Sequence, residues 1–295
     1  MNNFSTSSTL FSRNFSLNLG GRLVDLSTPA IMGIINATPD SFYQGSRVLE
    51  PAVAAEMARE MNEQGAEILD VGAVSSRPGA EEVTAEEELN RLSPVVEAVR
   101  TALPGCAISI DTCRSTVAKA MYQHFRIDMV NDISAGRMDP LMFSTMADLN
   151  IPYVMMHMQG TPQDMQKEPV YDNVVDDILQ FFGQRLHKLR RLGVNDVVID
   201  PGFGFGKTLE QNYQLLFGLD AFRILELPVM VGISRKSMIY KVLETEPGQA
   251  LNGTTAAHMA ALLGGASILR AHDVREAVET VKIFQRIVNR PSRSI

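Results

Sequence analysis

From residue 30 onward the chain repeats one pattern eight times, a short apolar and β-branched run followed by a longer segment that in most cases has helical periodicity. The short runs predict strands at residues 30–36, 67–73, 107–112, 129–134, 152–158, 197–202, 228–234 and 266–272. The clearest helical segments are residues 51–64, 84–101, 115–124, 173–192, 209–226, 253–263 and 274–289. Strands that alternate with helices form a parallel sheet, and eight such units in 295 residues favour an α/β fold with a closed (β/α)8 TIM barrel over an open doubly wound sheet.

The segment before residue 30 has a different character. Residues 1–14 are rich in Ser, Thr and Asn, so we expect a loose N-terminus there. Residues 15–19 and 22–27 alternate like two short strands around Gly20-Gly21, which predicts a β-hairpin that could close the bottom of the barrel. No linker composition follows, so we expect one barrel domain over residues 15–290.

Composition excludes several classes of partner. The net charge of −7 argues against nucleic acid or an anionic membrane as the main partner, because both need a basic face. The chain start lacks the pattern of a signal peptide, and the most apolar stretch, residues 256–269, is interrupted by Gly264 and Gly265. Cys106 and Cys113 have neither zinc-site nor redox spacing, so we expect reduced thiols and a cytoplasmic location.

Polar or charged side chains end nearly every predicted strand. They are Asn36, Asp70, Asp111, Asn131, Asp132, His157, Asp200, Ser234, Arg235, Lys236, Arg270 and His272. Polar residues can simply mark where a strand leaves the core, but a whole ring of them is better explained by an active site, which TIM barrels place at this rim. Its carboxylates and cations could hold a heterocycle and an anion together.

Two motifs resemble sites of another kind. Residues 201–208, PGFGFGKT, look like a phosphate-binding loop, but Pro201 stands where the Walker A motif requires Gly. We interpret the segment as a tight turn into a helix, with Phe205 free to form a pocket wall. The histidines lack zinc-binding spacing, and we expect His187 and His258 to be surface or packing residues. A metal, if present, would be Mg²⁺ held by oxygen ligands and a phosphate.

Taken in order, the rim segments resemble those of the dihydropteroate synthases, a family of pterin-binding enzymes, from about residue 31 to 279. The segments are GIINATPDSF, DVGAVSSRPGA, SIDT, NDISAG, MMHMQGTPQDMQ, IDPGFGFGKT, VGISRKS and GTTAAHMAALLGGASILRAHD. The resemblance implies that 6-hydroxymethyl-7,8-dihydropterin pyrophosphate condenses with p-aminobenzoate to give 7,8-dihydropteroate and pyrophosphate. It also implies a homodimer.

The resemblance further implies residue roles. The pterin would lie in a slot lined by Asp111, Asn131, Asp200 and Lys236, whose groups match an edge of alternating donors and acceptors. Apolar contact with the ring faces would come from Met156 and Phe205. The pyrophosphate would bind Asn36, Arg270 and His272, with Asn36 also near Mg²⁺.

Two loops, residues 38–46 and 75–82, would close over the site and form the aminobenzoate pocket. The residues assigned to that pocket are Phe42, Ser76, Arg77, Pro78 and Ser237. Catalytic roles fall on Asp40, Arg77, Lys236, Arg270 and His272, since the reaction needs a stabilised leaving anion and an aligned amine. The loops depart from the family at Gln44 and Val74, where it carries acids, while Ser76 keeps the hydroxyl of the usual Thr.

Two alternatives stay open. A pterin-binding methyltransferase shares the barrel and the pterin contacts but has no use for a pyrophosphate clamp, so residues 234–237 and 270–273 together with Arg77 favour the synthase. A catalytically inactive pterin-binding paralogue is the other alternative, because of the two altered loops.

Overall fold

The structure is a computed structural model that describes residues 15–37, 49–75, 83–165, 167 and 169–288. Within these ranges ten strands form two sheets. The hairpin strands are β1 (Ser16–Leu19) and β2 (Arg22–Asp25). The large sheet contains β3 (Ala30–Asn36), β4 (Ile68–Gly72), β5 (Ala107–Asp111), β6 (Met129–Asp132), β7 (Tyr153–Met156), β8 (Val197–Asp200), β9 (Met230–Val231) and β10 (Ile268–Ala271).

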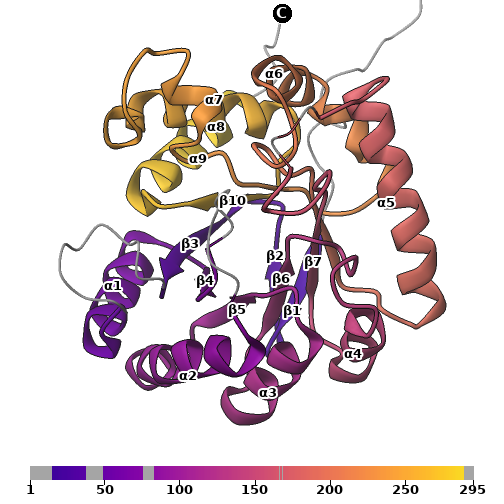
Figure 1. Cartoon of the computed structure of the whole chain (residues 1–295). Helices are drawn as coiled ribbons and strands as arrows, with labels where there is room; N and C mark the ends of the chain where they lie inside the picture. The colour runs from indigo at the N-terminus through magenta and orange to yellow at the C-terminus, as the bar shows by residue number, and fades with distance from the viewer. Residues whose placement is uncertain (1–14, 38–48, 76–82, 166, 168, 289–295) are drawn as a thin grey trace, which may run out of the picture.

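Helices surround the large sheet (Figure 1). The α-helices are α1 (Pro51–Gln64), α2 (Ala85–Ala102), α3 (Ser115–Phe125), α4 (Met142–Leu149), α5 (Val174–Arg191), α6 (Leu209–Phe217), α7 (Ser237–Tyr240), α8 (Leu251–Leu263) and α9 (Val274–Val288). Two 3₁₀ turns, η1 (Leu219–Leu225) and η2 (Pro247–Gln249), complete the described elements. No helix in the described ranges is long and apolar enough to cross a membrane.

The large sheet closes on itself. Its strands are parallel and follow the order β8-β7-β6-β5-β4-β3-β10-β9. A bridge between Ile199 and Val229 joins the two ends, where the Ile199 amide donates to the Pro228 carbonyl at 3.0 Å. The predicted (β/α)8 barrel is therefore confirmed.

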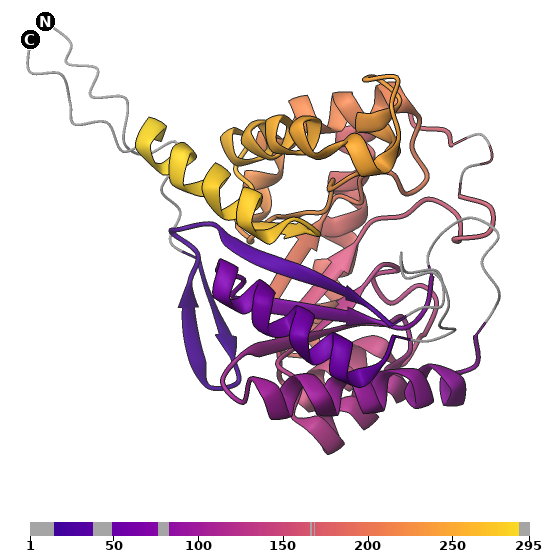
Figure 2. The same ribbon diagram turned by 90° about the vertical axis from the view of Figure 1, so that its left-hand side faces the viewer.

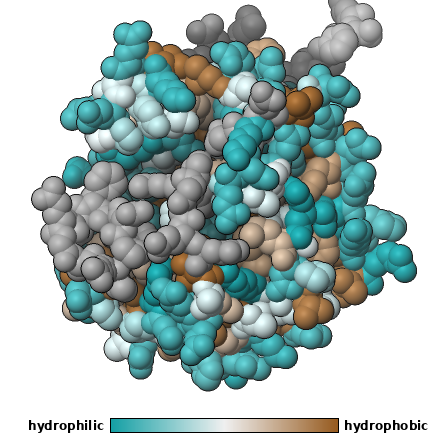
Figure 3. All heavy atoms as spheres, in the orientation of Figure 1, coloured by the Kyte–Doolittle hydropathy of each residue, from teal (hydrophilic) through white to brown (hydrophobic). Residues whose placement is uncertain are grey.

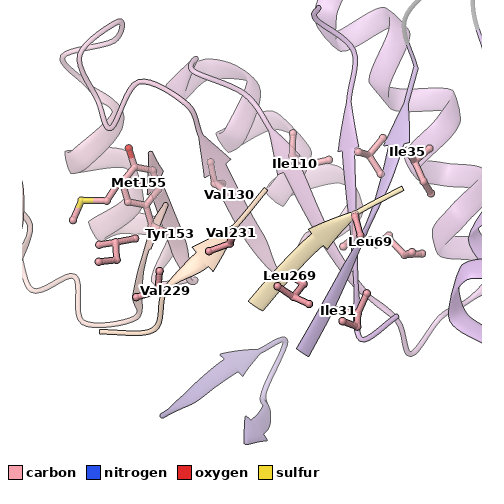
Figure 4. Packing of buried hydrophobic residues seen from close by; sticks show 14 of the residues in the cluster. Ile31, Ile35, Leu69, Ile110, Val130, Tyr153, Met155, Val229, Val231 and Leu269 are labelled. Atoms are coloured by element: carbon pink, nitrogen blue, oxygen red, sulfur yellow. The ribbon is translucent and has the colours of Figure 1, made fainter. Parts of the chain in front are cut away.

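Alternation along each strand separates two cores. In β4, Leu69 and Val71 join the large cluster between the sheet and the helices, and Figure 4 shows outward strand residues of this cluster. Ile68 belongs instead to the cluster inside the barrel. Asp70 shares the inward side of β4 with Ile68, two residues away, so the pleat directs a carboxylate into the barrel.

The N-terminal hairpin closes the bottom of the barrel, as predicted. Leu17, Leu19 and Leu26 pack in one cluster with inward residues near the starts of the barrel strands, including Ile68 and Met129. Figure 2 shows the hairpin at the side of the barrel from which the strands begin. Burial of these apolar side chains stabilises the closed end, and it leaves the opposite end for polar groups.

The structure corrects some predicted element bounds. The helix predicted over 209–226 ends at Phe217, and η1 begins after Gly218. Gly218 stands at this junction and packs closely against α5, where an added β-carbon would lie 2.8 Å from the Val175 side chain. After the bridge at Val229, the strand predicted over 228–234 continues only through Met230 and Val231. It ends there because a turn follows, in which the Lys236 amide donates to the Ile233 carbonyl. Helices α4 and α7 were not predicted.

Candidate functional site

Asp70 lies at the centre of a hydrogen-bonded group inside the barrel. Its side chain is fully buried, and its Oδ2 accepts from Arg270 Nε at 2.7 Å and from Asn131 Nδ2 at 2.9 Å. The same guanidinium donates from Nη2 to Asp111 Oδ2 at 3.1 Å. Strands β4, β5, β6 and β10 therefore bring together Asp111, Asn131 and Arg270 through Asp70, a member of the predicted polar ring for which the sequence suggested no specific role.

The group holds one guanidinium between two carboxylates. Burial raises the pKa of Asp111 to about 7, the Arg270 guanidinium opposes that rise, and the Asp70 carboxylate adds to it. Burial works against the charge on Arg270, but Asp70 and Asp111 outweigh it and raise the pKa of that guanidinium. Arg270 therefore stays cationic at the rim.

A second pair of opposite charges lies on the other side of the ring. Asp200 ends β8, and its Oδ1 accepts from the Gly202 amide at 2.8 Å. Burial raises the pKa of Asp200, while Lys236 lowers it. Lys236 Nζ donates to the Phe203 carbonyl at 2.6 Å and lies 4.6 Å from the centre of the Phe205 ring, a cation–π contact. Burial lowers the pKa of Lys236 to about 8, although Asp200 opposes that shift.

The segment 201–208 is a tight turn, as predicted. Gly202, Gly204 and Gly206 all have positive φ, between 61° and 81°. Gly202 also lies against β7, where a β-carbon would come within 1.9 Å of the His157 carbonyl oxygen. The turn leads into α6, which begins with a capping box between Thr208 and Gln211.

Lys207 anchors this turn from inside the protein. The side chain is only 3% exposed, and its Nζ contacts the Gly202 carbonyl at 2.8 Å, the Phe205 carbonyl at 3.0 Å and His157 Nδ1 at 3.2 Å. Burial lowers the pKa of Lys207 to about 7. Lys207 is not among the predicted site residues, because a lysine between a glycine-rich turn and a helix cap carries no signal of burial.

Apolar side chains lie beside the charged groups. Met156 ends β7, is buried and belongs to a small cluster with Met158, Met165, Ile133 and Phe205. Phe205 is half-buried and contacts Lys236 through its ring. On the face seen in Figure 1, Figure 3 shows hydrophilic residues interspersed with smaller apolar patches.

The remaining described candidates lie at the rim with fewer contacts. Ser237 is the first residue of α7 and is half-buried. His272 is exposed, with Nδ1 3.1 Å from Ser234 Oγ. Asn36 is exposed at the end of β3. Asp40, Phe42, Ser76, Arg77 and Pro78 fall outside the described residues.

Other polar strand ends serve structure. Asp132 neighbours Asn131 but points to the outer side, where it accepts from Tyr153 Oη at 2.6 Å and Ser134 Oγ at 2.6 Å. Arg235 forms a bidentate pair with Asp273, with both contacts at 2.8 Å. Along β6, strand parity therefore separates a site residue, Asn131, from Asp132, which holds a loop.

Comparison with known proteins decides the family. The family model described as "pterin binding enzyme" matches residues 32–272. A Haemophilus influenzae dihydropteroate synthase is 41% identical over 270 residues, covering 91% of this chain and 97% of that protein. The chain belongs to the dihydropteroate synthase family.

Solved structures of the dihydropteroate synthase family have the same barrel. The Yersinia pestis dihydropteroate synthase with a sulfonamide drug has a TM-score of 0.87 at 40% identity. The match covers 92% of this chain and 99% of the Yersinia pestis chain. The Xanthomonas albilineans dihydropteroate synthase with 4-aminobenzoic acid has a TM-score of 0.86 at 38% identity. The match covers 95% of this chain and 100% of the Xanthomonas albilineans chain.

The side chains that could act as metal ligands indicate which metal ion could bind. Among the described residues, no group of three His, Cys, Asp or Glu side chains is placed to hold a metal ion. His187 is exposed, and His258 is buried on α8. The exposed amide of Asn36 offers one oxygen, which suits Mg²⁺ because that ion commonly takes few protein ligands and fills its shell with water and phosphate oxygens.

Proposed function

We propose that this chain catalyses the condensation of 6-hydroxymethyl-7,8-dihydropterin pyrophosphate with p-aminobenzoate, releasing 7,8-dihydropteroate and pyrophosphate, as a transferase of folate biosynthesis. The observation that carries the proposal is the inward ring of Asp111, Asn131, Asp200, Lys236 and Arg270. Such a ring offers acceptors, donors and cations in one place, as a pterin with a pyrophosphate arm requires.

The pterin would bind across the two charged groups. Asp111 and Asp200 supply carboxylate acceptors, Asn131 supplies an amide, and Lys236 supplies an ammonium beside the Phe205 ring. Met156 supplies an apolar surface for the ring face. Binding there needs little motion of the protein, because each polar group is already fixed by a hydrogen bond or an ion pair.

The leaving pyrophosphate would be stabilised at the rim by Arg270, His272 and a Mg²⁺ ion near Asn36. Arg270 has its guanidinium fixed by two carboxylates, so its position is set before substrate binds. Mg²⁺ would neutralise the charge that develops on the phosphate oxygens. The aminobenzoate would lie between Ser237 and the loop residues Phe42, Ser76, Arg77 and Pro78, with Asp40 nearby. A relative with bound 4-aminobenzoic acid supports the class of second substrate.

We also propose a cytoplasmic homodimer. Both cysteines are free thiols. Exposed apolar side chains lie on α6, on α8 and beyond α7, elements in mutual contact, and Phe217 at the end of α6 is 93% exposed. Sedimentation should give twice the chain mass, and Phe217→Asp should give one chain mass. A wild-type protein of one chain mass at micromolar concentration would refute the dimer.

Pyrophosphate release tests the activity. With pterin pyrophosphate, p-aminobenzoate and Mg²⁺, we expect turnover that sulfonamides inhibit competitively against p-aminobenzoate. Normal binding of pterin pyrophosphate with release no faster than without protein would indicate an inactive paralogue. No binding of the pyrophosphate ester, together with methyl transfer to a corrinoid protein, would indicate the methyltransferase.

A further inference from the structure

We propose that Asp70 is a positioning residue that determines which hydrogen-bonding group Asn131 presents to the ligand. It also fixes the Arg270 guanidinium against Asp111. The inference rests on the proposed function, because it takes the ligand of Asn131 to be a pterin. Its basis is the arrangement of donors and acceptors around one buried carboxylate oxygen.

The orientation of the Asn131 amide follows from chemistry. Asp70 Oδ2 receives a hydrogen bond from Arg270 Nε, and a guanidinium has donors only, so this oxygen acts as an acceptor. The end of the Asn131 side chain that faces it at 2.9 Å must therefore be the NH₂ group. The Asn131 carbonyl oxygen is left on the other branch of the amide.

That carbonyl oxygen needs a donor. Asn131 is 3% exposed, and its Oδ1 is buried with no hydrogen-bond partner among the described residues. Buried acceptors are seldom left unpaired, because desolvation without a hydrogen bond costs free energy. A ligand that brings an N–H or NH₂ group to this oxygen satisfies it, as the aminopyrimidinone part of a pterin does.

Asp70 thus acts on specificity through Asn131. While the carboxylate is present, rotation of the amide by 180° would place the Asn131 carbonyl against the Asp70 oxygen, which is unfavourable for two acceptors. Asp70→Ala removes the acceptor shared by Arg270 and Asn131, so both orientations of Asn131 become available. The variant should accept ligands that present a carbonyl where a pterin presents its amino group.

The experiment compares two ligands on wild-type protein and Asp70→Ala. Calorimetry measures the Kd of 6-hydroxymethylpterin pyrophosphate and of its lumazine counterpart, in which a carbonyl replaces the 2-amino group. We expect wild type to prefer the pterin by about a thousandfold or more, because a site built to bind a donor leaves a buried group unpaired without it. In Asp70→Ala the preference should fall at least about tenfold.

A matched control measures the stability cost alone. Asp128 is another buried aspartate paired with an arginine, since its Oδ2 accepts from Arg100 Nη2 at 2.8 Å and from the Ile108 amide at 2.8 Å. The Ile108 amide lies near the start of β5, so this contact is away from the rim. Asp128→Ala should lower the melting temperature and leave the pterin-to-lumazine ratio at the wild-type value.

Two outcomes are decisive against the inference. An unchanged ratio in a folded Asp70→Ala variant overturns it, and so does an equal loss of affinity for both ligands, which would reflect a merely structural role. If the variant does not fold, NMR of wild-type protein with labelled asparagine decides. The Asn131 NH₂ protons should be protected from exchange before ligand is added, and rapid exchange there would refute the contact. Wild-type protein that binds neither ligand would instead refute the proposed function.

Discussion

Lys207→Met replaces a buried amine with an apolar side chain of similar length. In the native protein the Lys207 nitrogen contacts two carbonyls of its own turn and His157 Nδ1. At pH 9 the amine is neutral, so it donates to the two carbonyls and accepts from the His157 Nδ1–H, and the variant leaves these three groups without their partner inside the protein. We expect it to be less stable than wild type by about 3 kcal/mol at pH 9, from about 1 kcal/mol for each hydrogen bond.

The pH dependence of that difference tests the burial of Lys207. Its pKa is about 7 in the folded protein, against an ordinary value of 10.5. Between these two values the unfolded chain binds a proton that the folded protein does not, so this residue contributes more stability as pH rises. The limiting slope is about 1.4 kcal/mol per pH unit. From pH 7.5 to 9 the difference between wild type and variant should widen by about 2 kcal/mol.

Urea unfolding monitored by circular dichroism at pH 7.5, 8.25 and 9 measures the difference. Lys119→Met, which removes an exposed lysine from α3, is the control and should give a difference that does not change with pH. A constant difference for Lys207→Met would mean that the folded protein keeps the proton on Lys207 throughout this range. That result would refute the argument that desolvation governs this side chain.

Three further predictions concern the site. Lys236→Ala should weaken pterin binding about 100-fold, because it removes a charged donor beside Asp200, and unchanged affinity by calorimetry would contradict the slot. Pterin affinity should fall as pH drops below about 7, where Asp111 takes a proton, and Asp111→Asn should remove this dependence. A wild-type affinity that is constant from pH 6 to 8 would refute this role of Asp111. Arg77→Ala should spare pterin binding and lower turnover, so equal loss of both would show that the loop assignment is wrong.

Much of the architecture was predictable from local patterns. Eight apolar runs alternating with helical segments determined a parallel barrel, because each pattern reflects the burial of one face of one element. The Gly20-Gly21 turn determined the hairpin, and evenly spaced glycines at 202–206 determined a turn in place of a phosphate loop. The order of the rim segments along the chain already resembled the family that the comparisons show.

The sequence also placed polar residues at the strand ends without distinguishing their directions. Asn131 and Asp132 are adjacent, yet one reaches Asp70 inside the barrel and the other accepts from Tyr153 outside it. A shift of one residue in strand register would exchange the two faces. Periodicity predicts that a strand exists far better than it predicts which side chain faces inward.

Only the tertiary structure decided the partners within the site. Arg270 contacts Asp70 and Asp111 across 200 and 159 residues of chain, and Lys207 reaches back 50 residues to His157. These contacts depend on closure of the barrel, which joins β10 to β3 and so to β4, and on the depth at which each strand enters it. Local sequence carries propensity and periodicity, whereas the pairing of distant charges is fixed only when all the strands are in register.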